Sequence, residues 1–371
     1  MAVVTAYSTA TSIDAAVAEV ATQLSSEKPK LVVYFASSVY PPPELASAMD
    51  KAFAGAAVLG CTTAGEIASG RMLKNSLVAM ALGADIVEDI AVEVIKNVRD
   101  GHGTEEAVQA LAAHFNQKPL ELDPTEYVGL VLFDGLSGAE EMINDKIGDV
   151  TNVFFVGGSA GDDLNFSKTH VFVQGQALSN VAVLALIKAA VPFNIIKTQS
   201  FIPTGKKFKV TEALESQRTI VKMDGEPAAE VYARAVGRKV EEIGEEFMRY
   251  PLGLMAGGEP FIRSPQRVQE DKIVFYCAVK EGMVLELMEA QDMIPDTEAA
   301  IKAADQELGG IQALIVFNCI LRTLQLENEG KTEFFGKIFA GYPTVGFSTY
   351  GESYIGHINQ TATMLAFGSR R

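Results

Sequence analysis

Three short segments of the sequence combine glycine, hydroxyl-bearing side chains and carboxylates. They read GCTTAGE (60–66), GGSAGDD (157–163) and GFSTYGE (346–352). Glycine lets a ligand approach the backbone, while exposed N–H groups and hydroxyls can hold an anion. A carboxylate at the end of the same loop can hold an ammonium group. A carboxylate and an ammonium close together describe an amino acid, so we predict that these loops bind an amino acid or a similar small metabolite.

Charged residues supply the two halves of this predicted site. Glu66 and Glu352 are expected to contact the cationic group, and Arg263 and Arg322 to clamp the carboxylate, because a guanidinium can bind a carboxylate through two parallel hydrogen bonds. The full set of candidate ligand-binding residues is Thr62, Thr63, Gly65, Glu66, Ser159, Asp162, Arg263, Asn318, Arg322, Ser348, Thr349 and Glu352. We predict no catalytic residue and no metal ligand. The plainer alternative is that the loops are ordinary turns and the arginines form structural ion pairs.

The sequence is compatible with two further chemistries, ester or amide hydrolysis and heme ligation. The second segment also matches G-x-S-x-G, which would make Ser159 a hydrolase nucleophile with His170 or His357 as its base. That motif needs a helix after the serine, whereas the residues that follow read as loop and strand. The other alternative is axial ligation of a heme iron by one of the candidate residues Cys61, His102, His114, His170 and His357.

The elements around the three loops recur as well. In each of 31–66, 129–163 and 313–352, an apolar strand, a helix and a second apolar strand precede the loop, and another apolar strand follows it. In the third copy ALIVFNCILR (313–322) reads as one strand. We therefore predict an α/β fold of two domains with mixed β-sheets, built on this recurring unit. Because open α/β sheets bind ligands beyond their strand ends, the loops should border a cleft.

Composition narrows the class of protein. A chain of 371 residues exceeds the usual size of one hydrophobic core, so two domains are expected. A net charge of −16 disfavours nucleic acids and anionic membrane surfaces as partners. No secretory signal or apolar run of about 18 residues is visible. The three cysteines are widely spaced, which favours a reducing compartment, so we expect a cytoplasmic protein.

The chain resembles the FIST sensory proteins. The segments that carry the resemblance occur in order as GCTTAGEI, GGSAGDD, IVKMDGEPAAEVY, PLGL, PFIRS, EGMVLELM, VFNCILR and GFSTYGE. The resemblance implies a FIST N-like domain over 1–210 and a FIST C-like domain over 211–371. It also implies a non-catalytic small-ligand sensor of bacterial and archaeal signalling, for which amino acids are proposed ligands.

The same resemblance supplies an alternative function and a partner. Some members are similar in being heme proteins that sense nitric oxide and control a histidine kinase. Since the chain leaves no room for a fused output domain, the resemblance implies a separate signalling protein, such as a histidine kinase, as partner. We commit to no cofactor, and heme stays the alternative.

Overall fold

The computed structural model describes residues 3–24, 28–354 and 356–369. Two compact units share the chain. The first comprises Met1–Thr198, Thr297–His357 and Ala362–Arg371, and the second comprises Gln199–Asp296 and Ile358–Thr361. The second unit is thus mainly an insertion into the first, and no single cut in the chain separates the two.

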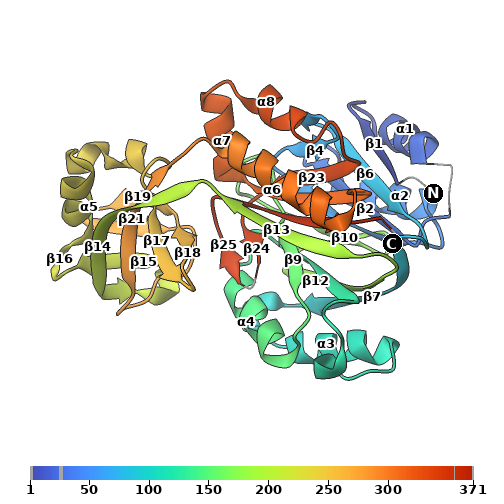
Figure 1. Ribbon diagram of the computed structural model, residues 1–371, viewed down its shortest axis with the longest axis horizontal. Coiled ribbons are helices and arrows are strands. Elements are labelled where there is room, and N and C mark those ends of the chain that lie inside the picture. Colours follow the sequence, from blue (N-terminus) through green and yellow to red (C-terminus); the bar gives the residue numbers. More distant parts are fainter. Residues whose placement is uncertain (1–2, 25–27, 355, 370–371) are drawn as a thin grey trace. The chain divides into compact units, whose positions relative to one another are not determined.

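The first unit is built from three copies of one β-α-β-α-β-β-β-β sequence of elements, and the third copy has one additional helix (Figure 1). The first repeat contains β1 (Val4–Ser8), α1 (Ile13–Leu24), β2 (Leu31–Ser37), α2 (Pro42–Ala52), β3 (Ala57–Thr63), β4 (Glu66–Ala68), β5 (Arg71–Leu73) and β6 (Leu77–Leu82). The second contains β7 (Val87–Lys96), α3 (Thr104–His114), β8 (Tyr127–Phe133), α4 (Glu140–Val150), β9 (Phe155–Ser159), β10 (Val171–Val173), β11 (Gln176–Leu178) and β12 (Val181–Ala189).

The third repeat carries the insertion between its first strand and its first helix. It contains β13 (Phe193–Gln199), α6 (Met293–Leu308), β22 (Ala313–Cys319), α7 (Ile320–Asn328), α8 (Thr332–Lys337), β23 (Thr344–Thr349), β24 (Glu352–Ser353), β25 (His357–Ile358) and β26 (Thr361–Phe367). The prediction of an α/β fold with mixed sheets built on a recurring unit is confirmed.

Each repeat forms a six-stranded sheet that is completed by a hairpin from another repeat. The strand orders are β1-β6-β2-β3-β10-β11, β7-β12-β8-β9-β24-β25 and β13-β26-β22-β23-β4-β5. The hairpin β4–β5 of the first repeat joins the sheet of the third, β10–β11 of the second joins the first, and β24–β25 of the third joins the second. The exchange is therefore cyclic and ties the three sheets together.

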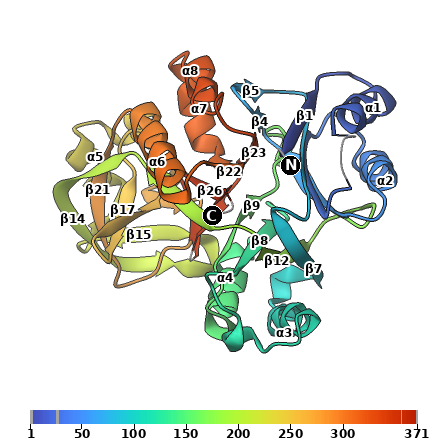
Figure 2. The ribbon, with the colours of Figure 1, turned by 45° about the vertical axis from the view of Figure 1, so that its right-hand side comes forward.

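Strand alternation explains why the three sheets face one another. Successive side chains of a strand point to opposite faces. In β2, Leu31, Val33 and Phe35 enter a core shared by all three sheets, whereas Val32, Tyr34 and Ala36 pack with the residues of α1 and α2. Figure 2 shows helices on the outer side of each sheet, with α1 and α2 beside β1 and with α3 and α4 beside β7 and β12. The shared core brings the loop ends of the central strands together.

The second unit is a curved antiparallel sheet with one helix. Its elements are β14 (Phe201–Leu214), β15 (Thr219–Met223), β16 (Glu226–Pro227), α5 (Ala228–Val236), β17 (Leu252–Ala256), β18 (Glu259–Arg263), β19 (Pro265–Gln269), β20 (Lys272–Phe275) and β21 (Val284–Ala290). The strand order is β18-β17-β21-β14-β15-β20-β19, with β16 paired to β15. Tyr232 of α5 is fully buried in the core of this unit and donates a hydrogen bond to the Tyr250 carbonyl at 2.7 Å.

None of the helices among the described residues is both long enough and apolar enough to cross a bilayer.

Candidate functional site

The three loops predicted from the sequence meet in the first unit and bond to one another in a ring. Each loop donates at least one backbone N–H to a carbonyl of another loop. Three of these bonds close the ring and run from Ala64 N to Ser348 O (3.2 Å), from Gly161 N to Thr62 O (2.9 Å) and from Tyr350 N to Ser159 O (3.2 Å). We call these three loops, 60–66, 157–163 and 346–352, the loop ring.

The first glycine of each loop is required by a close backbone approach. A Cβ added to Gly60, Gly157 or Gly346 would lie 2.0, 1.7 or 2.3 Å from the carbonyl oxygen of the neighbouring parallel strand. Real side chains do not tolerate such distances, so only glycine fits. The shared geometry also shows that the three glycines are equivalent positions, which aligns the residues six places later: Glu66, Asp163 and Glu352.

Glu66 of the first loop is buried among hydroxyl groups. Thr63 Oγ1 bonds its Oε1, while Ser76 donates to its Oε2 through its backbone N–H at 3.1 Å and its hydroxyl at 2.5 Å. Burial raises the pKa of Glu66 to about 8, although the hydrogen bonds from Ser76 and Thr63 oppose the shift. The carboxyl group is therefore mainly protonated at neutral pH and can itself donate a hydrogen bond.

The third loop adjoins a buried guanidinium. Ser348 Oγ lies 2.8 Å from Thr323 Oγ1, which accepts a hydrogen bond from Asn318 Nδ2 at 3.0 Å. Arg322 donates from Nε to Asn318 Oδ1 at 3.0 Å and from Nη2 to Thr297 Oγ1 at 2.9 Å. The chain here is not one strand as the sequence suggested. β22 ends at Cys319 and Arg322 lies in the first turn of α7, where Arg322, Thr323 and Leu326 lie on one buried helical face.

Thr349 links the third loop to the second. Its hydroxyl accepts a hydrogen bond from Ser159 N at 2.8 Å and lies 2.8 Å from the carbonyl oxygens of Ser159 and Gly351. Ser159 Oγ lies 3.2 Å from Glu140 Oε1. The next regular element after Ser159 is β10, twelve residues later, so the helix that a nucleophile elbow needs does not follow it.

The second loop differs from the other two because extra residues separate it from its hairpin. β4 and β24 begin at Glu66 and Glu352, whereas β10 begins only at Val171. In the added segment, Asp162 accepts hydrogen bonds from the Tyr350 hydroxyl (2.6 Å) and from three backbone N–H groups of residues 166–168. Partial burial opposes ionisation, but these bonds lower the pKa of Asp162 below its ordinary value.

The sequence prediction missed Asp163 and its two partners. Asp163 Oδ2 accepts hydrogen bonds from the Ser37 hydroxyl and from both the hydroxyl and the backbone N–H of Ser38. A signal was available, since Asp163 stands at the same offset from Gly157 as Glu66 does from Gly60. Ser37 and Ser38 carry no such signal, because two serines after a strand are common in turns.

Most predicted residues of the first unit are sealed inside it. The exposed fraction is 2% or less for Thr62, Thr63, Glu66, Ser159, Asp162, Asn318, Arg322, Ser348, Thr349 and Glu352. Gly65 is buried too, and its carbonyl accepts a hydrogen bond from Ser348 N at 2.7 Å. A ligand can reach these groups only if the loop ring opens. Arg263 belongs to the second unit, where it is half-buried on β18 and donates to the Ile262 carbonyl at 3.3 Å.

Two hollows lie away from these side chains. One of about 10 Å³ sits in the shared core between apolar residues such as Val33, Leu130 and Phe317, and it is at most the size of one water molecule. Another of about 720 Å³ adjoins the ends of α1 and α2. Its described lining runs over Ala21–Leu24, Lys28–Pro29 and 52–56, and 25–27 lie outside the described residues. We assign it no ligand.

The heme alternative was tested against these residues. The described lining of the larger hollow contains no histidine, cysteine, methionine or tyrosine, which are the usual axial ligands. Cys61 is fully buried on β3, and burial, followed by the nearby Glu66, raises the pKa of its thiol well above the ordinary value. Cys61 and the lining of this hollow do not fit heme, and we derive no step through it.

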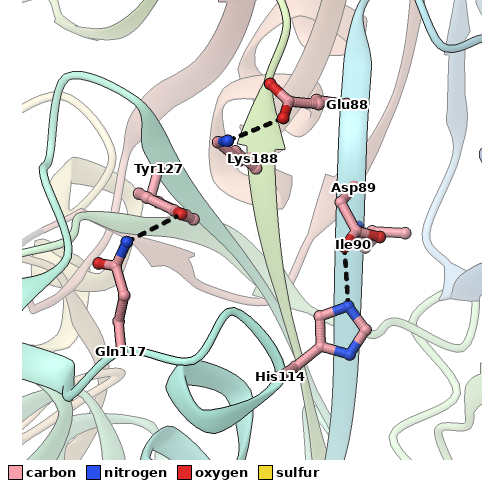
Figure 3. A network of polar contacts seen from close by, with 7 residues as sticks. All are labelled: Glu88, Asp89, Ile90, His114, Gln117, Tyr127 and Lys188. Atoms are coloured by element: carbon pink, nitrogen blue, oxygen red, sulfur yellow. Dashed lines mark hydrogen bonds and ion pairs between the residues drawn. The ribbon is translucent and has the colours of Figure 1, made fainter.

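A second polar network lies on the sheet of the second repeat (Figure 3). His114 Nε2 at the end of α3 is 3.0 Å from Asp89 Oδ2 on β7, and Lys188 of β12 pairs with Glu88 at 2.7 Å. Partial burial acts against the shift, but the bonds from the Ile90 N–H and from His114 lower the pKa of Asp89. Because these groups are largely exposed, we interpret the network as surface ion pairing.

The chain matches the models of known domain families and is similar to a known protein. The model of the FIST N domain matches residues 30–226, and that of the FIST C domain matches residues 228–354. The boundary between these matches falls inside the second compact unit. The chain is also similar to an uncharacterized protein of Methanocaldococcus jannaschii, with 24% identity over 268 residues. This match covers 68% of the chain and 51% of that protein, so the chain spans about half the length of its relative.

Proposed function

Because the chain belongs to the FIST family, whose domains are sensory domains of signal transduction, we propose that it is a cytoplasmic, non-catalytic sensor of an amino acid or a similar small metabolite. The ligand would bind at the loop ring. It would be held by the groups that the three repeats bring together there.

The observation that carries this proposal is the burial of ionisable side chains around the ring. Glu66, Arg322 and Glu352 are each at most 2% exposed. Burying such groups costs free energy that an apolar core would avoid. A ligand with one anionic and one cationic group would bind to the ring through these side chains. The ring is therefore better suited to a charged metabolite than to structural packing alone.

The proposed roles follow from the side-chain chemistry. Arg322 would bind the ligand carboxylate, because a planar guanidinium can hold a carboxylate through two parallel hydrogen bonds. Glu352, together with Glu66 once it has released its proton, would bind the ammonium group. Hydroxyls of Thr63, Ser348 and the other loop residues would donate further hydrogen bonds.

Binding would require the ring to open and to close again around the ligand. The ring is held by backbone hydrogen bonds between loops, each worth about 0.5–1.5 kcal/mol net, so local opening costs less than global unfolding. The change in loop conformation on ligand binding would be the signal. A separate signalling protein, such as a histidine kinase, would receive it.

The test is a thermal-shift screen of purified protein against the proteinogenic amino acids and related metabolites. A ligand at 100 times its Kd should stabilise the protein by about 2.7 kcal/mol. Arg322→Lys and Glu352→Gln keep most of the side-chain volume but should lose most of this shift. Arg234→Lys, at an exposed position of the second unit, is the matched control and should retain it.

Two results would overturn the proposal. One is that no compound in the screen shifts the wild-type transition. The other is that a compound binds equally well to wild type and to both ring variants.

A further inference from the structure

The side chain of Asp163 occupies a cradle of donors at the end of β2. Its Oδ2 accepts hydrogen bonds from Ser37 Oγ at 2.9 Å, from Ser38 N at 2.9 Å and from Ser38 Oγ at 2.6 Å. Three donors from two neighbouring residues therefore converge on one carboxylate oxygen. The cradle is thus an anion site that the chain fills with a carboxylate of its own.

The segment that brings Asp163 to the cradle is held in an unfavourable conformation. Asp163, Leu164 and Phe166 have φ of 54°, 66° and 48°, and left-handed geometry is costly for residues other than glycine. Leu164 and Phe166 are also 38% and 56% exposed, so apolar burial contributes little. Polar contacts of Asp162 and Asp163, together with the stacking of Phe166 on Tyr350, offset these costs.

We propose that the Ser37–Ser38 cradle is a carboxylate-binding site for which Asp163 is a built-in competitor. A small carboxylate ligand would displace the Asp163 side chain from Ser37 and Ser38 and loosen the second loop at this residue. This inference goes beyond the proposed function, because Arg322 adjoins a different loop of the ring and the cradle does not depend on what Arg322 binds.

The burial of the cradle explains why displacement needs a carboxylate. Ser37 is 0% exposed, so its hydroxyl would lose its acceptor if Asp163 simply left. A ligand carboxylate keeps all three hydrogen bonds and at the same time lets the left-handed residues relax. Displacement of Asp163 by the ligand also frees its backbone N–H, which donates to the Thr63 carbonyl at 3.0 Å. Loss of this hydrogen bond would transmit the effect of ligand binding from the cradle to the first loop.

The test is rescue of Asp163→Gly by acetate. This change removes a CH2–COO− group, which is one hydrogen short of acetate, and glycine tolerates the positive φ. The variant should melt below wild type. Saturating sodium acetate should raise its Tm by about 2–4 °C more than sodium chloride does at equal ionic strength.

Two controls make the result specific. Asp163→Asn keeps the cradle filled, so its response to acetate should equal that of wild type. Adding Ser38→Ala to the glycine variant removes one donor and should weaken acetate binding about tenfold. Equal shifts with acetate and chloride in the glycine variant, or an equally strong response of Asp163→Asn, would overturn the proposal.

A second measurement applies if the glycine variant does not fold. In the single variant Ser38→Ala, hydrogen exchange of the Asp163 amide should accelerate at least about tenfold. Exchange of the Ala64 amide, which bonds to Ser348 O, serves as the internal reference and should stay unchanged. Unchanged exchange at Asp163 would mean that the cradle does not hold the loop, and the proposal would fail.

Discussion

Replacing Glu66 by glutamine should change how stability depends on pH. Glu66 is 1% exposed, and its pKa in the folded protein is about 8, against an ordinary value of 4.5. The folded protein therefore favours the protonated carboxyl group, whereas the unfolded chain releases the proton above pH 4.5. This contribution to stability is fully present below pH 4.5 and is lost as the pH rises to about 8.

The magnitude follows from proton linkage. Between these two pKa values, wild type should lose about 1.4 kcal/mol of stability per pH unit relative to Glu66→Gln, which cannot ionise. The full difference across the window is on the order of 5 kcal/mol. Glutamine suits the site, because its carbonyl can accept from Ser76 and its amide can donate to Thr63.

The assay is urea unfolding of both proteins at pH 5, 6, 7, 8 and 9, at constant ionic strength. The free energy of unfolding of the variant, relative to that of wild type, should rise steadily up to about pH 8 and then stay constant. Glu44→Gln, on the exposed part of α2, is the matched control and should track wild type throughout. If Glu66→Gln and wild type give parallel curves from pH 5 to 8, the carboxyl group ionises normally and the reasoning is refuted.

Three further changes test other parts of the fold. Gly346→Ala should destabilise by about 1–3 kcal/mol in urea titrations, because its methyl group would lie 2.3 Å from a carbonyl oxygen, whereas Gly341→Ala meets nothing within 4 Å and should be tolerated. Thr349→Val should cost about 1–3 kcal/mol by leaving buried N–H groups without their acceptor, and Thr349→Ser should restore most of it. Asp89→Asn should cost only about 0.2–1 kcal/mol at pH 7, because the bond to His114 is exposed. Since the folded pKa of Asp89 is lowered, that difference should disappear as the pH falls below 3.8.

The sequence predicted the central parts of each repeat because their signals are local. Apolar strands such as 31–37, followed by a helix and a glycine loop, can be recognised within about 30 residues. The exchanged hairpins could not be predicted in this way. Strands of two or three residues, such as β24, have no periodicity, and their partners lie in another repeat.

The candidate site was predictable only in part, for two physical reasons. The prediction that Arg322 lies on a strand was wrong, because a short apolar run reads the same at the end of a strand and at the start of a helix. The cradle for Asp163 depends on an added segment whose path no pattern of residues indicates. The insertion of the second unit into the third repeat was likewise invisible, since it begins within polar strand residues near 199.

The cyclic exchange of hairpins has a consequence for how the protein is made. Until the third repeat leaves the ribosome, β4–β5 has no sheet to join and β9 presents an open edge. The earlier two repeats can form their helices and central strands, but neither the third sheet nor the ring can close. A chain stalled before β23 and β24 would therefore display unpaired strand edges, and the emergence of the third repeat, rather than the folding of either earlier repeat, covers the edges through which this molecule could self-associate.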